Sequence, residues 1–347
     1  MKNIIIFSAL IIAIINTSCK KNTVTPIPRD GKKIKIGLAL GSKGLGDRSF
    51  NDIQHKGLIS ALKTHNVTIV YKTSKKDTYG SYKKALIELA DKERCDLVFV
   101  GEGYGMAPVV NKIAPNYKKT HFVVMDFIAK KLKNVSSTTF AQYEGAYLAG
   151  VLAALMTKTK KIALIGGVNI PVVKEFEYGF LGGVKYINKK IETKITYITK
   201  KPNMKGFNMP QKAKTIADSL YKSGYDIIFS VAGKSGISII ESAQENKKYV
   251  IGVDTDQDYI APGFVLTSVM KRMDNVIVDI AGRYMKSELK GKKTYHYKIK
   301  NGGISLSPMT FTKDKIPSSV HDKIVKVMTK IIDGDIIVFD PTYGNKK

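Results

Sequence analysis

The sequence predicts an α/β fold in which two doubly wound lobes enclose a ligand cleft. Short apolar runs of strand length alternate with amphipathic stretches of helix length, which is typical of βα units and mostly parallel sheets. The 347 residues, 44% of them hydrophobic, are enough for two domains with separate cores. The two halves of the chain also repeat the same short motifs in the same order.

Residues 1–18 have the pattern of a secretory signal peptide. A basic start is followed by an uninterrupted apolar or small run, Ile4–Ile15, which is shorter than the about 20 residues that a membrane-spanning helix needs. Cys19 follows this segment and predicts lipoprotein processing, with lipid on the cysteine at the new N-terminus. Asn16 stands three positions before the cysteine, where leucine is usual, so a plain signal peptide with an incidental cysteine remains the alternative.

Residues 19–32 are polar, contain two prolines and are expected to form a flexible tether behind the lipidated cysteine. The mature protein would then be exported and anchored by lipid at a cell membrane, on its periplasmic face or at the cell surface. Cys95 is the only other cysteine. Its position between a helical stretch and a strand predicts a buried, unreactive thiol.

Apolar runs mark the expected strands, and the stretches between them mark the helices. We expect strands at Ile34–Leu40, Thr68–Lys72, Leu97–Val100, His121–Met125, Ile162–Ile165, Ile195–Ile198, Ile227–Val231, Tyr249–Val253 and Val265–Val269. Helical patterns include Tyr82–Lys92, Ala141–Met156, Lys212–Tyr221 and Ile237–Asn246. Open parallel sheets bind ligands beyond the carboxyl ends of their strands, so residues that follow these strands are expected at the cleft.

The repeat between the halves is carried by three matches. DLVFVGEG (Asp96–Gly103) matches DIIFSVAG (Asp226–Gly233), and HFVVMD matches YVIGVD further along each half. A glycine also precedes a phenylalanine by nine positions in both halves, at Gly41–Phe50 and at Gly167–Phe176. Three matches in one order predict two lobes built from similar units.

The chain is strongly basic, with 57 Lys and Arg against 29 Asp and Glu and a formal net charge of +28. The lysines are scattered as pairs, without a block of five or more like charges and without an interleaved aromatic stripe. This distribution favours a solvated basic surface over a nucleic-acid interface. Docking of the basic exterior on anionic polymers of a host or matrix remains open as another function.

The sequence contains no convincing catalytic, metal or cofactor motif. The Gly-Lys-Ser at Gly233–Ser235 lacks the glycine that a phosphate loop needs five positions earlier, where Ile228 stands. GEGYG is followed by Met106, where a dinucleotide fingerprint requires its last glycine. The five histidines are scattered without ligand spacing, and no triad order stands out. We therefore expect a binding protein without a cofactor rather than an enzyme.

Polar and aromatic residues gather where the predicted strands end. They are Asp47, Phe50 and Asn51 in the loop after the first strand, and Asp126, Gly233, Asp254 and Lys271 after later strands. Ionised carboxylates accept hydrogen bonds from N–H and O–H groups, and an aromatic ring stacks on a base. With Lys271 the only cation among them, the carboxylates should repel a phosphate. The pattern indicates a nucleoside rather than a nucleotide, with a sugar or other small metabolite as the alternative. An Asp at a strand end also often caps the next helix, so that role stays open for each carboxylate.

Long motifs resemble the basic membrane lipoprotein family, which comprises substrate-binding lipoproteins of ABC-type transporters related to a purine nucleoside receptor. These motifs are GDRSFND, VVMDF, YEGAYLAGVLAALMTKTKKIALIGG, FEYGFLGGVKYIN and YVIGVDTDQ, from about Ile34 to Lys271. The resemblance implies a type I periplasmic-binding-protein fold whose chain crosses between the lobes several times. We expect residues 33–138 plus 270–292 in the N-terminal lobe and residues 139–269 plus 293–347 in the C-terminal lobe.

The resemblance also implies a role for each cleft residue. Phe50 would stack on one face of the base, Asn51 and Asp126 would bond the base edge, Asp254 and Lys271 would hold the ribose hydroxyls, and Asp47 and Gly233 would complete the site. The second stacking ring of the family precedes an N-D-P stretch, which here reads FNMP. That position is Phe207, and Met209 replaces the usual Asp beside it. The implied partners are a purine nucleoside (adenosine, guanosine or inosine) and the permease and ATPase subunits of an ABC transporter.

Overall fold

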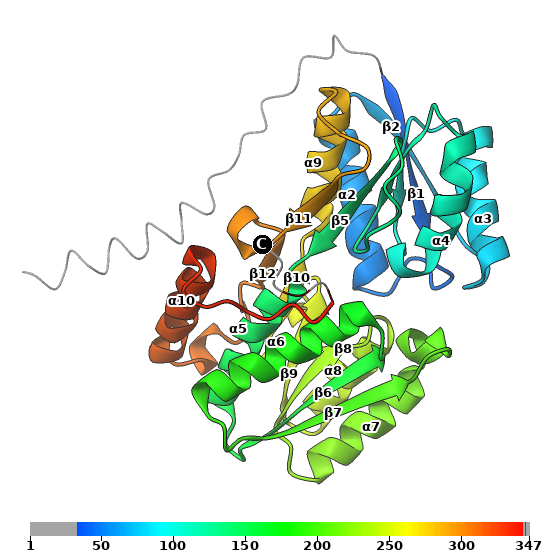
Figure 1. Cartoon of the computed structure of the whole chain (residues 1–347). Helices are drawn as coiled ribbons and strands as arrows, with labels where there is room; N and C mark the ends of the chain where they lie inside the picture. The colour runs from blue at the N-terminus through cyan, green and yellow to red at the C-terminus, as the bar shows by residue number, and fades with distance from the viewer. Residues whose placement is uncertain (1–32, 343, 345–347) are drawn as a thin grey trace, which may run out of the picture.

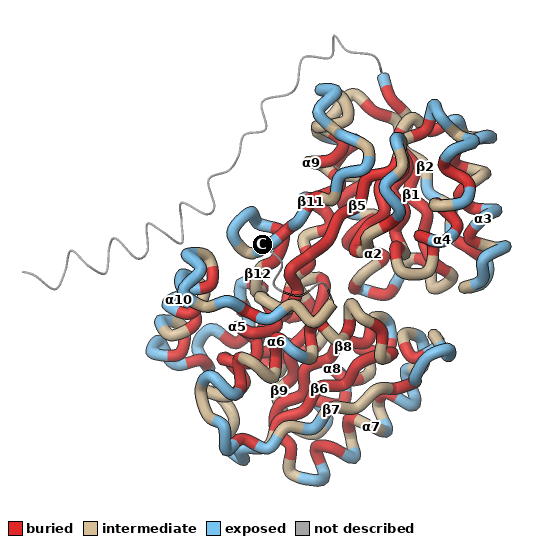
Figure 2. Tube along the Cα trace, in the orientation of Figure 1, coloured by how far each residue is buried: buried red, intermediate tan, exposed pale blue. Residues whose placement is uncertain are grey.

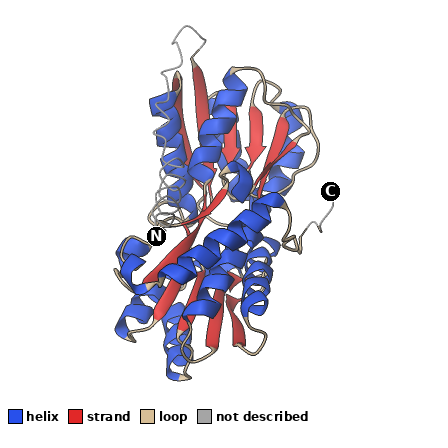
Figure 3. Cartoon of the chain, turned by 90° about the vertical axis from the view of Figure 1, so that its left-hand side faces the viewer, coloured by secondary structure: helices blue, strands red, loops and turns tan. Residues whose placement is uncertain are grey.

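Two six-stranded sheets lie in separate lobes, one above the other in Figure 1. The protein is described here by a computed structural model that covers residues 33–342 and residue 344. The predicted signal peptide, the lipidated Cys19 and the tether therefore lie outside the described residues. Helices cover both faces of each sheet, so that buried residues concentrate in the strands and in the helix faces turned toward them (Figures 2 and 3).

The first sheet is entirely parallel and has the strand order β11-β5-β4-β3-β1-β2. Its strands are β1 (Ile34–Leu40), β2 (Val67–Thr73), β3 (Leu97–Val100), β4 (His121–Val124), β5 (Val135–Phe140) and β11 (Thr294–Tyr297). The helices of this lobe are α2 (Phe50–Thr64), α3 (Tyr79–Ile87), α4 (Gly103–Ile113) and α9 (Met273–Met285). Residues of β1, β3 and β4 are almost all fully buried, as expected for strands that helices cover on both faces.

The second sheet has the order β12-β10-β9-β8-β6-β7 and is parallel except for β12, which pairs antiparallel with β10. Its strands are β6 (Lys161–Val168), β7 (Glu192–Thr199), β8 (Ile227–Val231), β9 (Tyr249–Asp254), β10 (Val265–Lys271) and β12 (Ile304–Leu306). The helices of this lobe are α5 (Gln142–Met156), α6 (Pro171–Ile187), α7 (Pro210–Lys222), α8 (Ser235–Glu245) and α10 (Ser318–Asp333). The two sheets therefore share the arrangement that the internal repeat predicts.

The chain passes between the lobes after β5, after β10 and after β11. Three of the expected lobe boundaries need correction. Residues 293–347 were expected in the second lobe, but β11 pairs with β5 and belongs to the first sheet. Residues 139–140 and 270–271 were likewise each assigned to the wrong lobe, because β5 continues to Phe140 and β10 continues to Lys271.

All the predicted strands are present, and most extend by a residue or more at one or both ends. The prediction missed β5, β11 and β12, because β5 reads VSSTTF and the other two are only four and three residues long. Phe50 and Asn51 were expected in a loop but are the first two residues of α2. Their side chains are therefore held by a helix rather than by a turn.

Cys95 is buried between helix and strand as predicted, and burial raises the pKa of its thiol to about 12. The thiolate, which is the reactive form, is thus strongly disfavoured. Within residues 33–342 and residue 344, none of the helices has the length and apolar character needed to cross a membrane.

Candidate functional site

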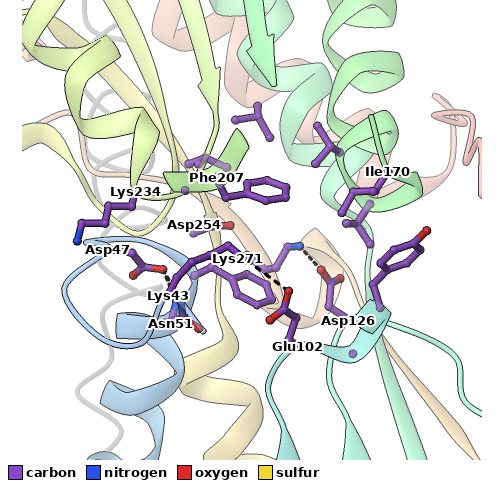
Figure 4. Close-up of a pocket in the computed structure, with 18 of the residues that line it drawn as sticks. Lys43, Asp47, Asn51, Glu102, Asp126, Ile170, Phe207, Lys234, Asp254 and Lys271 are labelled. Carbon is purple, nitrogen blue, oxygen red and sulfur yellow. Dashed lines mark hydrogen bonds and ion pairs between the residues drawn. The ribbon is translucent and has the colours of Figure 1, made fainter. Parts of the chain in front are cut away.

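A cavity of about 120 Å³ lies between the carboxyl ends of the two sheets (Figure 4). All eight residues predicted for the site line it: Asp47, Phe50, Asn51, Asp126, Phe207, Gly233, Asp254 and Lys271. The remaining walls come from Lys43, Glu102, Gly103, Tyr104, Met125, Ile170, Val172, Val173, Phe176, Met204, Val231, Lys234 and Val253. The structure therefore brings together, from both lobes, residues that lie more than 200 positions apart in the sequence.

Asp126 and Asp254 occupy equivalent places in the two lobes, just after β4 and at the end of β9. Both have left-handed backbone conformations, with φ values of 57° and 66°. Such conformations are uncommon for residues other than glycine, although Asp tolerates them better than most, and they cluster at functional sites. In each lobe this backbone turn aims a buried carboxylate into the cavity.

Lys271 neutralises Asp126 across the lobe junction. Its Nζ lies 2.6 Å from Asp126 Oδ2, and both side chains are buried. The ammonium also lies 5.7, 5.6 and 5.3 Å from the ring centroids of Phe50, Phe140 and Phe176. These rings face the cation and help to hold it without water. Lys271 was expected to act with Asp254, but its direct partner in this structure is Asp126.

Asp254 receives one hydrogen bond from the opposite lobe, from Ser49 Oγ to Oδ2 at 2.5 Å. Burial raises the pKa of both Asp254 and Asp126, and the Lys271 ammonium opposes that shift at each carboxyl. Carboxylates in so dry an environment gain strongly from a ligand that donates hydrogen bonds. Asp254 keeps free acceptor capacity for such a ligand, because a carboxylate has about four lone-pair positions.

Asp47 has a different role, since its carboxylate is saturated by protein donors. Oδ1 accepts hydrogen bonds from the backbone N–H groups of Ser49 and Asp52, and Oδ2 accepts from the backbone N–H and the side-chain Nδ2 of Asn51. Burial raises the pKa of Asp47 to about 6, and the backbone hydrogen bonds oppose that shift. The alternative interpretation, that an Asp at a strand end caps the next helix, is confirmed for Asp47. It also fixes the amide of Asn51.

Two aromatic rings face the cavity from opposite lobes. Phe50 begins α2, and Phe207 lies in a short 3-10 helix, η3 (Met204–Asn208). Gly167 makes room for the second ring, because a Cβ at Gly167 would lie 2.4 Å from Phe207 Cδ1. Phe176 and Tyr104 are further aromatic residues of the wall that the sequence had not indicated, although Phe176 is the counterpart of Phe50 in the internal repeat.

Lys43, Glu102 and Lys234 are further charged residues of the cavity wall that the sequence had not indicated. Lys43 Nζ lies 3.0 Å from Asp77 Oδ2 and 3.7 Å from Glu102 Oε1. Burial acts to lower the pKa of Lys43, but Glu102 and Asp77 outweigh it, and the net shift is upward. Burial raises the pKa of Glu102, and Lys43 opposes that shift. The expectation that Lys271 is the only cation beside the carboxylates of the cavity was therefore wrong.

Met209 does not line the cavity. Its backbone N–H donates to Ser235 Oγ at 2.7 Å, and its side chain packs on the apolar cluster beneath α7 and α8. In this structure, the departure from the N-D-P pattern alters the support behind Phe207 rather than the wall of the site.

The lobes are held together at the cleft by hydrogen bonds in addition to Ser49–Asp254. Thr255 Oγ1 and Gln257 Nε2 both donate to the backbone oxygen of Arg48, at 2.9 and 3.0 Å. The side chains that line the cavity are therefore held close together in a closed arrangement. Among the described residues, no group of three or more His, Cys, Asp or Glu side chains could hold a metal ion.

Several known proteins resemble this chain over most of its length. The profile of the family described as ABC transporter substrate-binding protein PnrA-like matches residues 34–341. The chain is 34% identical over 328 residues to the ABC transporter nucleoside-binding protein BmpA of Lactococcus lactis subsp. cremoris, with 88% of this chain and 89% of that protein covered. It is 30% identical over 316 residues to basic membrane protein D of Borreliella burgdorferi, with 89% of each covered.

Solved structures resemble the fold. ABC transporter solute-binding proteins from Aeropyrum pernix superpose with a TM-score of 0.79 at 22% identity, covering 89% of this chain and 94% of that chain. A solute-binding protein from Conexibacter woesei superposes with a TM-score of 0.72 at 18% identity, covering 90% of this chain and all of that chain. These likenesses confirm the predicted type I periplasmic-binding-protein fold.

Proposed function

This chain belongs to the PnrA-like family of ABC transporter substrate-binding proteins, and on that premise we propose that it captures purine nucleosides for uptake. Adenosine, guanosine and inosine are the candidate ligands, and the permease and ATPase subunits of an ABC transporter are the partners. The protein binds and releases its ligand unchanged. Closure of the lobes has only to favour the liganded state.

The observation that carries this proposal is the pairing of aromatic rings with incompletely satisfied polar groups in one buried cavity. Phe50 and Phe207 provide apolar walls from opposite lobes, which suits a flat base. Asn51 and Asp126 from the first lobe and Asp254 from the second provide groups for the N–H and O–H donors of a base and a ribose. The Lactococcus lactis relative, whose name describes a nucleoside-binding protein, supports the same ligand class.

Mass spectrometry of the ligand released by denaturing purified protein tests this proposal. We expect one or more purine nucleosides in stoichiometric amount when the protein is prepared from cells. Release of a sugar or another metabolite, followed by rebinding of that compound and not of nucleosides, would support the alternative function.

We also propose a lipid anchor at Cys19, on the grounds of the apolar segment that precedes it. A Cys19→Ala variant should remain unmodified and should lose its place in the membrane fraction, as measured by fractionation and by the mass of the mature N-terminus. A variant that fractionates with the membrane as the native protein does would contradict the anchor.

A further inference from the structure

In each lobe, the glycine that begins the internal repeat leaves room for one side chain that lines the cavity. A Cβ at Gly167 would lie 2.4 Å from the ring of Phe207. A Cβ at Gly41, the equivalent position of the first lobe, would lie 1.7 Å from Glu102 Oε2. The carboxylate of Glu102 thus fills the space left by the missing side chain of Gly41, as Phe207 does beside Gly167.

Glu102 is specific to the first lobe. It precedes α4 two residues after β3, and the repeated motif has Ala232 at the equivalent position of the second lobe. Its partner Lys43 lies 3.7 Å from Oε1, which favours the ionised carboxylate but is beyond hydrogen-bonding distance. Tyr82 and Lys43 both interact with the Glu102 carboxylate, and the remaining lone-pair positions leave it acceptor capacity toward the cavity that it lines.

Glu102 lines the same cavity as Phe50 and Phe207. Lys43, its neighbour, lies with Nζ 5.7 Å from the centroid of the Phe207 ring. Figure 4 shows Glu102 between Lys43 and Asp126, on the wall that the first lobe contributes, whereas Asp254 comes from the second lobe. A flat group that enters the cavity beside Phe207 and turns one edge toward the wall of the first lobe would meet Glu102 and Lys43 there.

We propose that Glu102 reads the base edge of the bound nucleoside and makes the protein prefer guanosine, an inference that rests on the proposed function. The two carboxylate oxygens accept the N1–H and the 2-amino N–H of guanine, and the Lys43 ammonium donates to O6. Hypoxanthine offers the same edge without the 2-amino group. Adenine has no 2-amino group and carries a lone pair at N1, so the carboxylate loses both N–H donors and meets a second acceptor instead.

Calorimetry with guanosine, inosine and adenosine tests this role in three variants of the stripped full-length protein. Glu102→Gln keeps the shape and replaces one acceptor by a donor. Gly41→Ala retains Glu102 but forces its carboxylate to move, since the new Cβ would collide with Oε2. Glu93→Gln is the matched control, because Glu93 pairs with Lys35 and Lys72 and does not line the cavity.

We expect the native protein to bind guanosine most tightly, then inosine, then adenosine. Glu102→Gln and Gly41→Ala should both weaken guanosine about 10- to 100-fold and adenosine by less than about threefold, while Glu93→Gln changes neither. A native preference for adenosine, or equal losses for all three ligands in Glu102→Gln, would overturn the role of Glu102 and leave nucleoside binding intact. Failure of the native protein to bind any nucleoside would instead refute the proposed function. Thermal melts of each variant show that a loss of binding does not come from unfolding.

Discussion

Asp47 and Asp254 are buried carboxylates of one cavity, but their hydrogen bonds give them different tasks. Asp47 accepts four hydrogen bonds from residues at the start of α2, whereas Asp254 accepts one from Ser49 and faces the ligand space. Their burial is similar, at 3% and 6% exposure. The two carboxylates therefore differ in their number of protein donors and not in their burial.

Alanine at these two positions should separate the two tasks. Asp47→Ala removes a helix cap and should lower the free energy of unfolding by about 0.5–2 kcal/mol. Asp254→Ala should leave stability nearly unchanged and weaken nucleoside binding by about 1–3 kcal/mol, because it removes a buried hydrogen-bond partner. Urea denaturation and calorimetry of both variants measure the two effects. The reverse pattern, with Asp254→Ala the less stable variant, would contradict this assignment.

Most of the cavity residues predicted from the sequence follow strands, whereas Phe207 was predicted from the family resemblance. Topology places such residues at the carboxyl edge of a parallel sheet whatever the details of packing. Lys43 and Glu102 also follow strands, β1 and β3, but nothing in the sequence distinguishes them from the many other charged residues of the chain. Their ion pairs with each other and of Lys43 with Asp77 are created only by the folded chain. The partner of Lys271 could not be predicted for the same reason, since Asp126 belongs to the other lobe.

At the scale of elements, apolar runs predicted the apolar strands, including the edge strands β2 and β7, and missed β5, β11 and β12. Central strands such as β3 and β8 are buried on both faces and consist mainly of apolar residues. By contrast, β5 is buried through Ser and Thr side chains that form hydrogen bonds, among them Ser136 with His121 and Thr139 with His296. A strand that satisfies polar side chains in this way carries no hydrophobic signal in the sequence.

Helix α6 carries a buried acid that makes stability depend on pH. Glu175 is 2% exposed, and its burial, aided by Asp126 and Asp340 and opposed by Thr342 and Lys271, raises its pKa to about 8. The folded state therefore holds this proton more tightly than the unfolded state, whose carboxyl titrates near 4.5. The corresponding stability is fully present below pH 4.5 and is lost as the pH rises through 8.

The glutamine of a Glu175→Gln variant does not ionise, so the stability of this variant should lack that pH dependence. Between pH 5 and pH 8, the free energy of unfolding of the native protein should fall by about 2–4 kcal/mol more than that of the variant, since one pKa unit corresponds to about 1.4 kcal/mol. Urea denaturation of both proteins at several pH values provides the comparison. Parallel profiles would mean that Glu175 is ionised in the folded protein at neutral pH.

At the scale of the whole molecule, the net positive charge of the chain and the ligand cavity are separate features. The net charge of +28 is spread over the chain, whereas the partly buried Lys43 and the buried Lys271 are already paired with carboxylates. Any binding of an anionic polymer such as heparin should therefore occur on the exterior surface and not in the cleft.

Polymer binding should fall steeply with salt, because exposed charges are screened over about 10 Å at 0.1 M ionic strength. Phe50→Ala should leave heparin retention unchanged while it weakens nucleosides. Retention of both proteins on a heparin column over a salt gradient measures this, and loss of retention in Phe50→Ala would show that the polymer enters the cleft.

The lobes meet around a cavity whose polar groups suit an uncharged ligand with many N–H and O–H donors. A 5′-phosphate in the closed cleft would lie near Asp126 and Asp254, and Lys43 and Lys271 are already engaged by carboxylates. Like charges in so dry a site cost several kcal/mol. Nucleosides should therefore bind more tightly than nucleotides, even though the wall contains more cations than the sequence suggested.

Calorimetry of stripped and refolded protein with guanosine, inosine, adenosine and their 5′-monophosphates tests purine nucleoside capture most directly. The account predicts one ligand per chain for at least one nucleoside, with the matching monophosphate at least about 10-fold weaker. Absence of nucleoside binding by refolded protein, or monophosphates that bind as tightly as nucleosides, would contradict it.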